Sequence, residues 1–274
     1  INDNNIELFG ISKYGSHMFV YTNNNILYGF GYNAFAQIGC KTEINNVSQP
    51  IIIKYNFNGK LKMIKCGCKH TLFLNENGYV YGSGNNKQGQ LTYKYNENIY
   101  NCIQNIIKSD NVTDIHCGIN SSYILNSNNN LFSFGSNNYA ELGINNKIIL
   151  KSDKINPILN DSKTIQFSVG SYHIGCLTNN NQVYMFGLNA DYQCGTKYYN
   201  VCHKPNIIRI NGEYIKHIKC ASYHNIIKTH NNTYYSFGKN DEQQLLIKNS
   251  IIFSKKSIYK PKLISTKYLY SLTK

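Results

Sequence analysis

Apolar and polar residues alternate along short stretches of this chain, which is the pattern of half-buried β-strands. The stretch 61–66 alternates in this way, and the next apolar run, 70–74, reads His-Thr-Leu-Phe-Leu. Asn77-Gly78 follows, and both central residues of a type I′ hairpin turn need a positive φ. Residues 79–81 (Tyr-Val-Tyr) then predict the returning strand. The pattern therefore predicts antiparallel strands joined by tight turns.

This strand pattern recurs five times along the chain. Its marker is a Gly-x-Asn motif whose glycines lie 53, 51, 52 and 51 residues apart. The motifs are Gly31 with Asn33, Gly84 with Asn86, Gly135 with Asn137, Gly187 with Asn189, and Gly238 with Asn240. We interpret them as structural turns, because no helix follows that could offer its N-terminus to a phosphate. Self-similarity at this period, with about four short strands per repeat and no helical pattern, predicts an all-β propeller of four-stranded antiparallel blades.

The fourth strand of a repeat follows a longer loop, as at 51–53 and 207–210. All four prolines stand just before this strand, namely Pro50, Pro157, Pro205 and Pro261. Proline is tolerated at the first position of a strand, since its missing N–H costs no ladder bond there. The prolines lie 19, 22, 18 and 23 residues after their Gly-x-Asn glycines, so this loop carries the length variation. Binding specificity usually lies in such loops.

A histidine also recurs once per repeat. The positions are His17, His70, His173 and His224, with Ser121 in the third copy. A ring of histidines could hold a metal or transfer protons. The alternative is that each imidazole forms a hydrogen bond with a backbone group of its own blade, a role that serine also fills. Blades splay apart around a ring, which keeps such residues beyond catalytic distance, so we favour the structural interpretation.

The formal net charge of +14 suits an anionic partner such as nucleic acid or an acidic protein. Arg209 is the one arginine among 28 basic residues, and lysine lacks the bidentate geometry with which arginine recognises phosphates and bases. The alternative to an anion-binding surface is a solvated lysine surface. A candidate basic interaction patch lies near the end of the chain, at Lys248, Lys255, Lys256, Lys260, Lys262 and Lys267.

Enzyme motifs are not recognisable in the sequence. The chain has no phosphate-binding loop, no His-Glu-x-x-His and no Gly-x-Ser-x-Gly. We therefore predict no catalytic residue, no metal site and no cofactor. The nine cysteines are odd in number and scattered, which favours free thiols in an intracellular, reducing compartment, with nucleus, cytosol and organelle left open. No apolar run approaches the ~20 residues of a membrane span.

Three segments carry a resemblance to a known family. They are 66–72 (Cys-Gly-Cys-Lys-His-Thr-Leu), 77–81 (Asn-Gly-Tyr-Val-Tyr) and 84–91 (Gly-Asn-Asn-Lys-Gln-Gly-Gln-Leu), and they resemble the repeat of the regulator of chromosome condensation family. The resemblance extends from about residue 6 to the end of the chain. It implies a β-propeller of about seven blades. Residues 1–274 would then form a single propeller domain of five repeats, as a fragment of a longer chain.

The resemblance also implies two classes of function. The founding member of the family is a nuclear guanine-nucleotide exchange factor for the small GTPase Ran and also binds nucleosomes, whereas many relatives are interaction modules. Exchange-active members carry an inserted wedge, for which the uniform repeat spacing leaves no room here. We predict a non-enzymatic scaffold that docks on a protein or ribonucleoprotein. The alternatives are an exchange factor for a Ran-like GTPase, and chromatin or RNA binding through the lysine-rich surface.

Two further departures from the family pattern concern the repeat itself. Ser83 replaces the aromatic residue before its glycine, and Leu246 stands where a closing glycine is expected, which predicts an altered turn. If each repeat starts with the strand that follows its proline, the first strand of this chain, 6–12, is the second strand of a repeat. It ends with 262–265 and then 268–272, which matches the 6–12 strand again. Five closed repeats would leave 268–272 without a place, so the pattern predicts a larger propeller.

Overall fold

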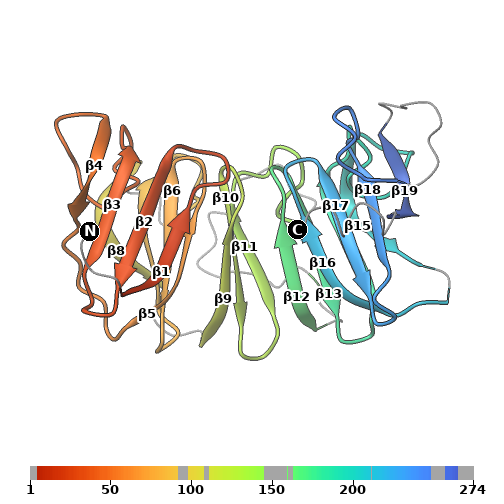
Figure 1. Cartoon of the computed structure of the whole chain (residues 1–274), viewed down its shortest axis with the longest axis horizontal. Helices are drawn as coiled ribbons and strands as arrows, with labels where there is room; N and C mark the ends of the chain where they lie inside the picture. Colours follow the sequence, from red (N-terminus) through yellow and green to blue (C-terminus); the bar gives the residue numbers. More distant parts are fainter. Residues whose placement is uncertain are drawn as a thin grey trace. The chain divides into compact units, whose positions relative to one another are not determined.

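The computed structural model describes residues 5–91, 98–107, 111–144, 159, 163–210, 212–247 and 257–264. Within these ranges the chain forms nineteen β-strands and no helix. The strands build four sheets of four strands and one of three strands (Figure 1). Every pair of neighbouring strands in these sheets is antiparallel. The prediction of an all-β chain of repeated antiparallel sheets is confirmed.

The chain divides into two compact units, each with its own sheets. The sheets of the first unit are β1 (Ile6–Ile11), β2 (His17–Thr22), β3 (Leu27–Tyr32) and β4 (Asn46–Ile52); β5 (Leu61–Cys66), β6 (His70–Asn75), β7 (Val80–Asn85) and β8 (Ile99–Ile107); and β9 (Val112–Cys117), β10 (Ser121–Asn126) and β11 (Leu131–Gly135). The sheets of the second are β12 (Thr164–Val169), β13 (His173–Thr178), β14 (Val183–Leu188) and β15 (Val201–Ile208); and β16 (Ile215–Cys220), β17 (His224–Thr229), β18 (Tyr234–Gly238) and β19 (Ile258–Leu263).

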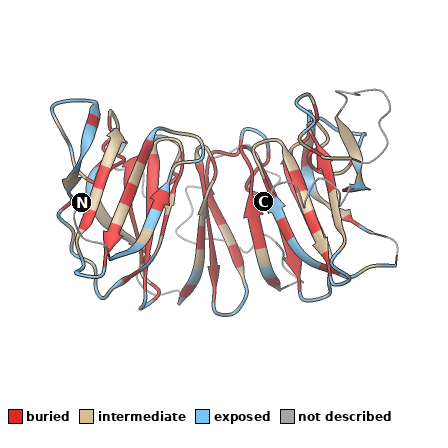
Figure 2. Ribbon diagram, viewed as in Figure 1, coloured by how far each residue is buried: buried red, intermediate tan, exposed pale blue. Residues whose placement is uncertain are grey.

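The core lies between successive sheets of each unit, and the strands that form it carry many buried residues (Figure 2). In the first unit the ring of Phe19 packs edge-on against that of Phe73 in the next sheet, with 5.1 Å between centroids. In the second unit Met185 of β14 shares a buried cluster with Ile218 and Phe237 of the following sheet. The repeated apolar positions thus join one sheet to the next.

Each four-stranded sheet begins with the alternating strand and ends with the strand that follows the long loop. The predicted start of the repeat at the proline strand is wrong, since β4 pairs with β3 and β19 pairs with β18. The long loop lets the chain fold back on its own hairpin. Consequently β1 is the first strand of its sheet and not the second strand of a repeat. The segment 268–272 lies outside the described residues.

The prolines lie inside the fourth strands, which corrects their predicted place before them. Pro50 belongs to β4, Pro205 to β15 and Pro261 to β19, whereas Pro157 lies outside the described residues. These strands are sheet edges, and each pairs with a register shift next to its proline. An edge strand at a bulge leaves backbone positions without a ladder partner, so proline's missing N–H costs nothing there.

The turn that closes at Leu246 keeps the geometry of its repeats, so the predicted alteration is wrong. The Leu246 amide donates to the Gln243 carbonyl at 3.2 Å, as the Gly39 amide does to Ala36 at 3.0 Å. Leu246 adopts a φ of 50, in the left-handed region that glycine prefers. The local hydrogen bonds of the turn therefore hold a leucine in a conformation that costs about 1–2 kcal/mol.

Three of the recurring histidines, His17, His70 and His173, link one sheet to the next, which corrects the predicted bond inside their own sheet. The Nε2 atom of each of these three lies in hydrogen-bonding contact with a side chain of the following sheet, and that side chain donates to a loop carbonyl of the histidine's own sheet. The links are His17 to Thr71 Oγ1 at 2.9 Å and on to the Gln37 carbonyl, His70 to Ser122 Oγ at 3.1 Å and on to the Gln90 carbonyl, and His173 to Asn225 Oδ1 at 2.9 Å and on to the Gln193 carbonyl. The imidazoles thus help to fix the stacking of sheets within each unit.

A candidate docking site on the β14–β15 loop

The loop between β14 and β15 is held from beneath by the asparagine of its Gly-x-Asn motif. The Asn189 Oδ1 atom accepts from the Cys194 amide at 2.8 Å. Its Nδ2 group donates to the carbonyls of Thr196 at 2.9 Å and Tyr199 at 2.5 Å. Asn33 holds its own loop in the same way, accepting from the Ile38 amide at 3.0 Å. The motif therefore supplies a firm base for a loop of variable length and sequence.

The residue six positions after each motif glycine closes the first turn of that loop. In every repeat its side-chain oxygen accepts a hydrogen bond from the backbone amide two residues earlier. The pairs are Gln37 with Phe35 at 3.0 Å, Gln90 with Gln88 at 2.9 Å, Glu141 with Tyr139 at 2.7 Å, Gln193 with Asp191 at 2.8 Å, and Gln244 with Glu242 at 2.9 Å. The sequence showed this recurrence but not its role, because a periodic residue does not reveal its partner.

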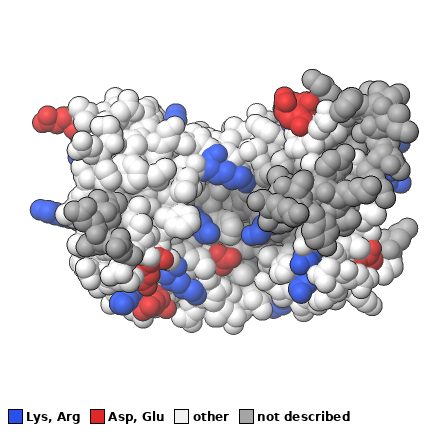
Figure 3. Space-filling model, viewed as in Figure 1, with Lys and Arg blue, Asp and Glu red and all other residues white. Residues whose placement is uncertain are grey.

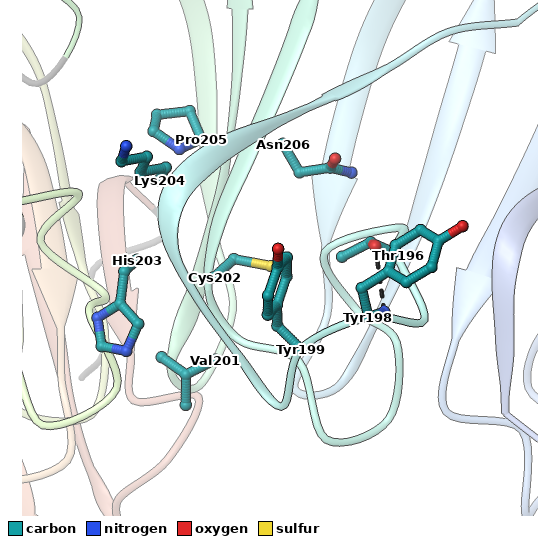
Figure 4. Close-up of a pocket in the computed structure, with 9 residues that line it drawn as sticks. All are labelled: Thr196, Tyr198, Tyr199, Val201, Cys202, His203, Lys204, Pro205 and Asn206. Atoms are coloured by element: carbon teal, nitrogen blue, oxygen red, sulfur yellow. Dashed lines mark hydrogen bonds between the residues drawn. The ribbon is translucent and has the colours of Figure 1, made fainter.

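A pocket of about 540 Å³ opens above this base (Figure 4). Its lining comes from the loop and from the first part of β15, namely Thr196, Tyr198, Tyr199, Val201, Cys202, His203, Lys204, Pro205 and Asn206. The side chains of Tyr198 and Tyr199 are 76% and 67% exposed. Exposed tyrosines on a firm loop offer large, amphipathic contact area, and aromatic residues are enriched at protein interfaces. Sequence reasoning missed this pair, because it occurs in one repeat alone.

A cluster of lysines and tyrosines adjoins the pocket and draws on β19. The Lys197 ammonium lies 5.7 Å from the ring centre of Tyr198 and 5.8 Å from that of Tyr259. Lys260 lies 5.8 Å from the Tyr259 ring, and the Tyr192 ring centre is 6.1 Å from that of Tyr259. Lysines within about 6 Å of aromatic faces are attracted by the ring quadrupole. The cluster therefore presents positive charge next to the exposed tyrosines.

The predicted basic patch is only partly described. Lys260 joins the cluster just described, and Lys262 is exposed on the same strand, β19. On the face shown in Figure 3, Lys and Arg side chains are dispersed in small groups, some of them beside acidic side chains. The remaining members, Lys248, Lys255, Lys256 and Lys267, lie outside the described residues.

The structural repeat residues lie apart from the pocket lining. The motif glycines sit at or next to the ends of β3, β7, β11, β14 and β18, and Asn189 alone among the motif asparagines supports the pocket loop. The φ values are +102 at Gly31, +104 at Gly84, +108 at Gly135, +105 at Gly187 and +108 at Gly238. His224 begins β17.

The pocket lining suits the binding of a partner but contains few of the groups that catalysis uses. Its lining contains a histidine, a lysine and a cysteine but no carboxylate, so an acid–base pair of carboxylates cannot form there. Among the described residues no group of three or more His, Cys, Asp and Glu side chains is placed to hold a metal ion. The described part of the chain also contains no helix long and apolar enough to cross a membrane.

Comparison with known proteins identifies the class. The family model for the RCC1-like domain matches residues 3–273, so the chain belongs to the RCC1-like family of β-propellers. A solved structure of human WBSCR16 superposes with a TM-score of 0.84 at 16% identity, covering 98% of this chain and 69% of that one. Prp20p from Saccharomyces cerevisiae superposes with a TM-score of 0.79 at 20% identity, covering 95% and 65%.

Two curated human relatives are much longer than this chain. X-linked retinitis pigmentosa GTPase regulator is 28% identical over 81% of this chain, which spans 27% of that protein. E3 ubiquitin-protein ligase HERC2 is 26% identical over 78% of this chain, which spans 4% of it. An RCC1 domain-containing protein of Dictyostelium discoideum is 28% identical over 78% of this chain, which spans 52% of it.

Proposed function

We propose that this chain is a non-enzymatic docking module that binds a protein or ribonucleoprotein partner through the β14–β15 loop. The observation that carries the proposal is the exposed pair Tyr198 and Tyr199, held over a pocket by the hydrogen bonds of Asn189. A firm loop loses little conformational entropy on binding, so contacts made by its side chains contribute most of their energy to affinity. Aromatic anchors that become buried when the partner binds are typical interface hot spots.

The lysines beside the pocket define the preferred chemistry of the partner surface. Lys197 and Lys260 lie over the Tyr259 ring and keep positive charge close to the docking tyrosines. Such charges raise the rate of encounter with a surface rich in carboxylates or phosphates, and salt screens them. Binding to a nucleic-acid backbone uses a continuous row of basic side chains. A few lysines beside exposed tyrosines are enough for docking on a protein, so we favour a protein partner over chromatin or free RNA.

The names of relatives support a role in binding. The yeast relative was characterised for its binding to Gsp1p and histones, and the human relatives are named a GTPase regulator and a ubiquitin ligase. These statements concern those proteins. For this chain we propose docking alone, in an intracellular and reducing compartment, in keeping with its nine free thiols.

A nucleotide-exchange assay separates docking from exchange activity. The chain is mixed with Ran and related small GTPases loaded with fluorescent GDP, and GDP release is followed with and without it. We expect release within about twofold of the intrinsic rate, because only a group that stabilises the nucleotide-free state lowers the barrier, and each tenfold acceleration needs about 1.4 kcal/mol. Acceleration of roughly a hundredfold, equivalent to about 2.7 kcal/mol, would favour the exchange factor instead.

A further inference from the structure

Two cysteines replace a pair of apolar residues at the base of the docking loop. Cys194 occupies the position seven residues after its motif glycine, and Cys202 is the strand partner of that glycine, Gly187. The equivalent residues are Ile38 and Val47 in the first sheet, and Leu91 and Tyr100 in the second. Both cysteines are buried, at 0% and 3% exposure, in one apolar cluster. Packing alone therefore does not require sulfur at this place.

Both cysteines lie next to Gly187. The Cys194 sulfur is 3.7 Å from the Gly187 carbonyl oxygen, and Cys202 faces Gly187 across the β14–β15 ladder. The two side chains are close enough for each to shift the pKa of the other. A disulfide needs Cα atoms about 4.4–6.8 Å apart, and two cysteines that both adjoin Gly187 on neighbouring backbone segments are placed for such a crosslink.

The two thiols also differ in their pKa values. The hydrogen bond from Cys194 lowers the pKa of the Cys202 thiol, which favours its thiolate. Burial, followed by that hydrogen bond, raises the pKa of Cys194 well above the usual range. Cys202 is 3% exposed but lines the pocket, so the pocket is the path by which a small oxidant would approach it. The thiolate is the reactive form of cysteine, so Cys202 is suited to attack an oxidant and Cys194 to resolve the product.

We propose that Cys194 and Cys202 form a reversible disulfide when the protein meets hydrogen peroxide, and that this crosslink restrains the loop that displays Lys197, Tyr198 and Tyr199. The crosslink would hold the tyrosines in one arrangement and thereby regulate docking. The consequence for docking rests on the proposed function, whereas the crosslink itself does not.

The reaction balances with peroxide as the only co-reactant. The Cys202 thiolate attacks one peroxide oxygen, the O–O bond breaks, and the departing hydroxide takes up a proton to give water. Cys202 is then a sulfenic acid. The Cys194 sulfur attacks the Cys202 sulfur, the S–S bond forms, the S–O bond breaks, and the hydroxide leaves as water with the proton of Cys194. Two thiols and one peroxide yield one disulfide and two waters, and a thiol reductant reverses the crosslink.

Peptide mass spectrometry tests the crosslink without any partner. The reduced chain is treated with hydrogen peroxide, blocked with N-ethylmaleimide and digested with trypsin. Trypsin cleaves after Lys197, between the two cysteines, and after Arg209, beyond Cys202, because Pro205 blocks cleavage after Lys204. We expect linked peptides containing Cys194 and Cys202 to appear roughly tenfold faster than oxidation of Cys102, which is exposed and serves as the reference thiol. Oxidation of Cys202 no faster than that of Cys102, or its accumulation as sulfinic acid without a link, would overturn the proposal.

A matched variant distinguishes the redox role of Cys194 from its role in packing. Cys194→Val restores the apolar character that the other repeats have at this position, so the fold is expected to be kept. In this variant Cys202 should stop at the sulfenic acid and be trapped by dimedone, and no linked peptide should form. If the variant gives no dimedone adduct at Cys202, the assignment of Cys202 as the attacking thiol is wrong.

Limited proteolysis measures how far the crosslink restrains the loop. Peroxide should slow tryptic cleavage after Lys197 in the folded chain several-fold, and should leave the Cys194→Val variant unchanged. Equal cleavage rates before and after oxidation of the unmodified chain would overturn the restraint. All these results are independent of partner binding, so failure of the crosslink and failure of the docking proposal are told apart.

Discussion

Replacement of Gly135 by alanine should destabilise the protein by about 4 kcal/mol, at the severe end of single substitutions. Gly135 has a φ of +108, and a Cβ atom there would lie 2.5 Å from the Asn120 carbonyl oxygen and 3.2 Å from the Gln90 Cα. Both atoms belong to the backbone and cannot move aside cheaply. The melting temperature should fall by roughly 10 °C or more, since 1 kcal/mol corresponds to about 2–4 °C at this size.

Gly212 supplies the control for this prediction. It also has a positive φ, +74, but a Cβ atom there meets no atom within 4 Å. Gly212→Ala therefore tests backbone strain alone and should cost about 1–2 kcal/mol. Calorimetry on both variants distinguishes strain from steric clash. Equal melting temperatures for the two variants would show that close strand approach does not explain the recurrent glycine.

Mild acid should weaken the protein strongly, because the linking histidines are buried as neutral groups. Burial lowers the pKa of His17 to about 4. Burial, with a smaller contribution from the charge of His17, lowers the pKa of His70 to about 3. The unfolded chain takes up these protons near pH 6.5 while the folded chain does not. Stability is therefore fully present above about pH 6.5 and is lost as the pH falls toward about 4 and 3.

The free energy of unfolding should fall by about 2 kcal/mol for each histidine by about pH 5, where most carboxylates are still ionised. Urea unfolding at about pH 7 and pH 5 measures it. The double variant His17→Gln with His70→Gln is the control, because glutamine does not titrate and keeps a hydrogen-bonding side chain. The variant should lose most of the dependence on pH in this window. The same slope in both proteins would assign the acid sensitivity to other groups.

The sequence predicted the repeat and its hairpins because both follow from local backbone chemistry. Asn25, Gly78, Asn129, Asn181 and Asn232 lie in the hairpin turns of the five sheets, with φ values of 60, 79, 59, 59 and 59. Asparagine and glycine are the residues that tolerate this region best. Local preference of this kind is visible in a short window of sequence, so the sheets could be predicted copy by copy.

The pairing between sheets could not be predicted in the same way. Periodicity shows that His17 recurs, but not that its ring reaches Thr71 in the next sheet. The sequence does contain one sign of this pairing. Thr71, Ser122 and Asn225 occupy equivalent positions in their repeats, and in the repeat that follows Ser121 the equivalent residue is Ile174. A hydrogen-bonding residue is thus present at this position after a histidine and absent after the serine. The docking tyrosines left no such sign, since Tyr198 and Tyr199 belong to the variable loop.

Quantitative capture of a partner tests the docking claim most directly. The immobilised chain, the double variant Tyr198→Ala with Tyr199→Ala, and the control Tyr214→Ala are compared in native lysate by isotope-labelled mass spectrometry, and the captured protein is then titrated against each. Tyr214 is 71% exposed and does not line the pocket. We expect the affinity to fall roughly tenfold or more for the double variant and to stay within about twofold for Tyr214→Ala. Equal affinity of the double variant and the unmodified chain would contradict docking through the two tyrosines.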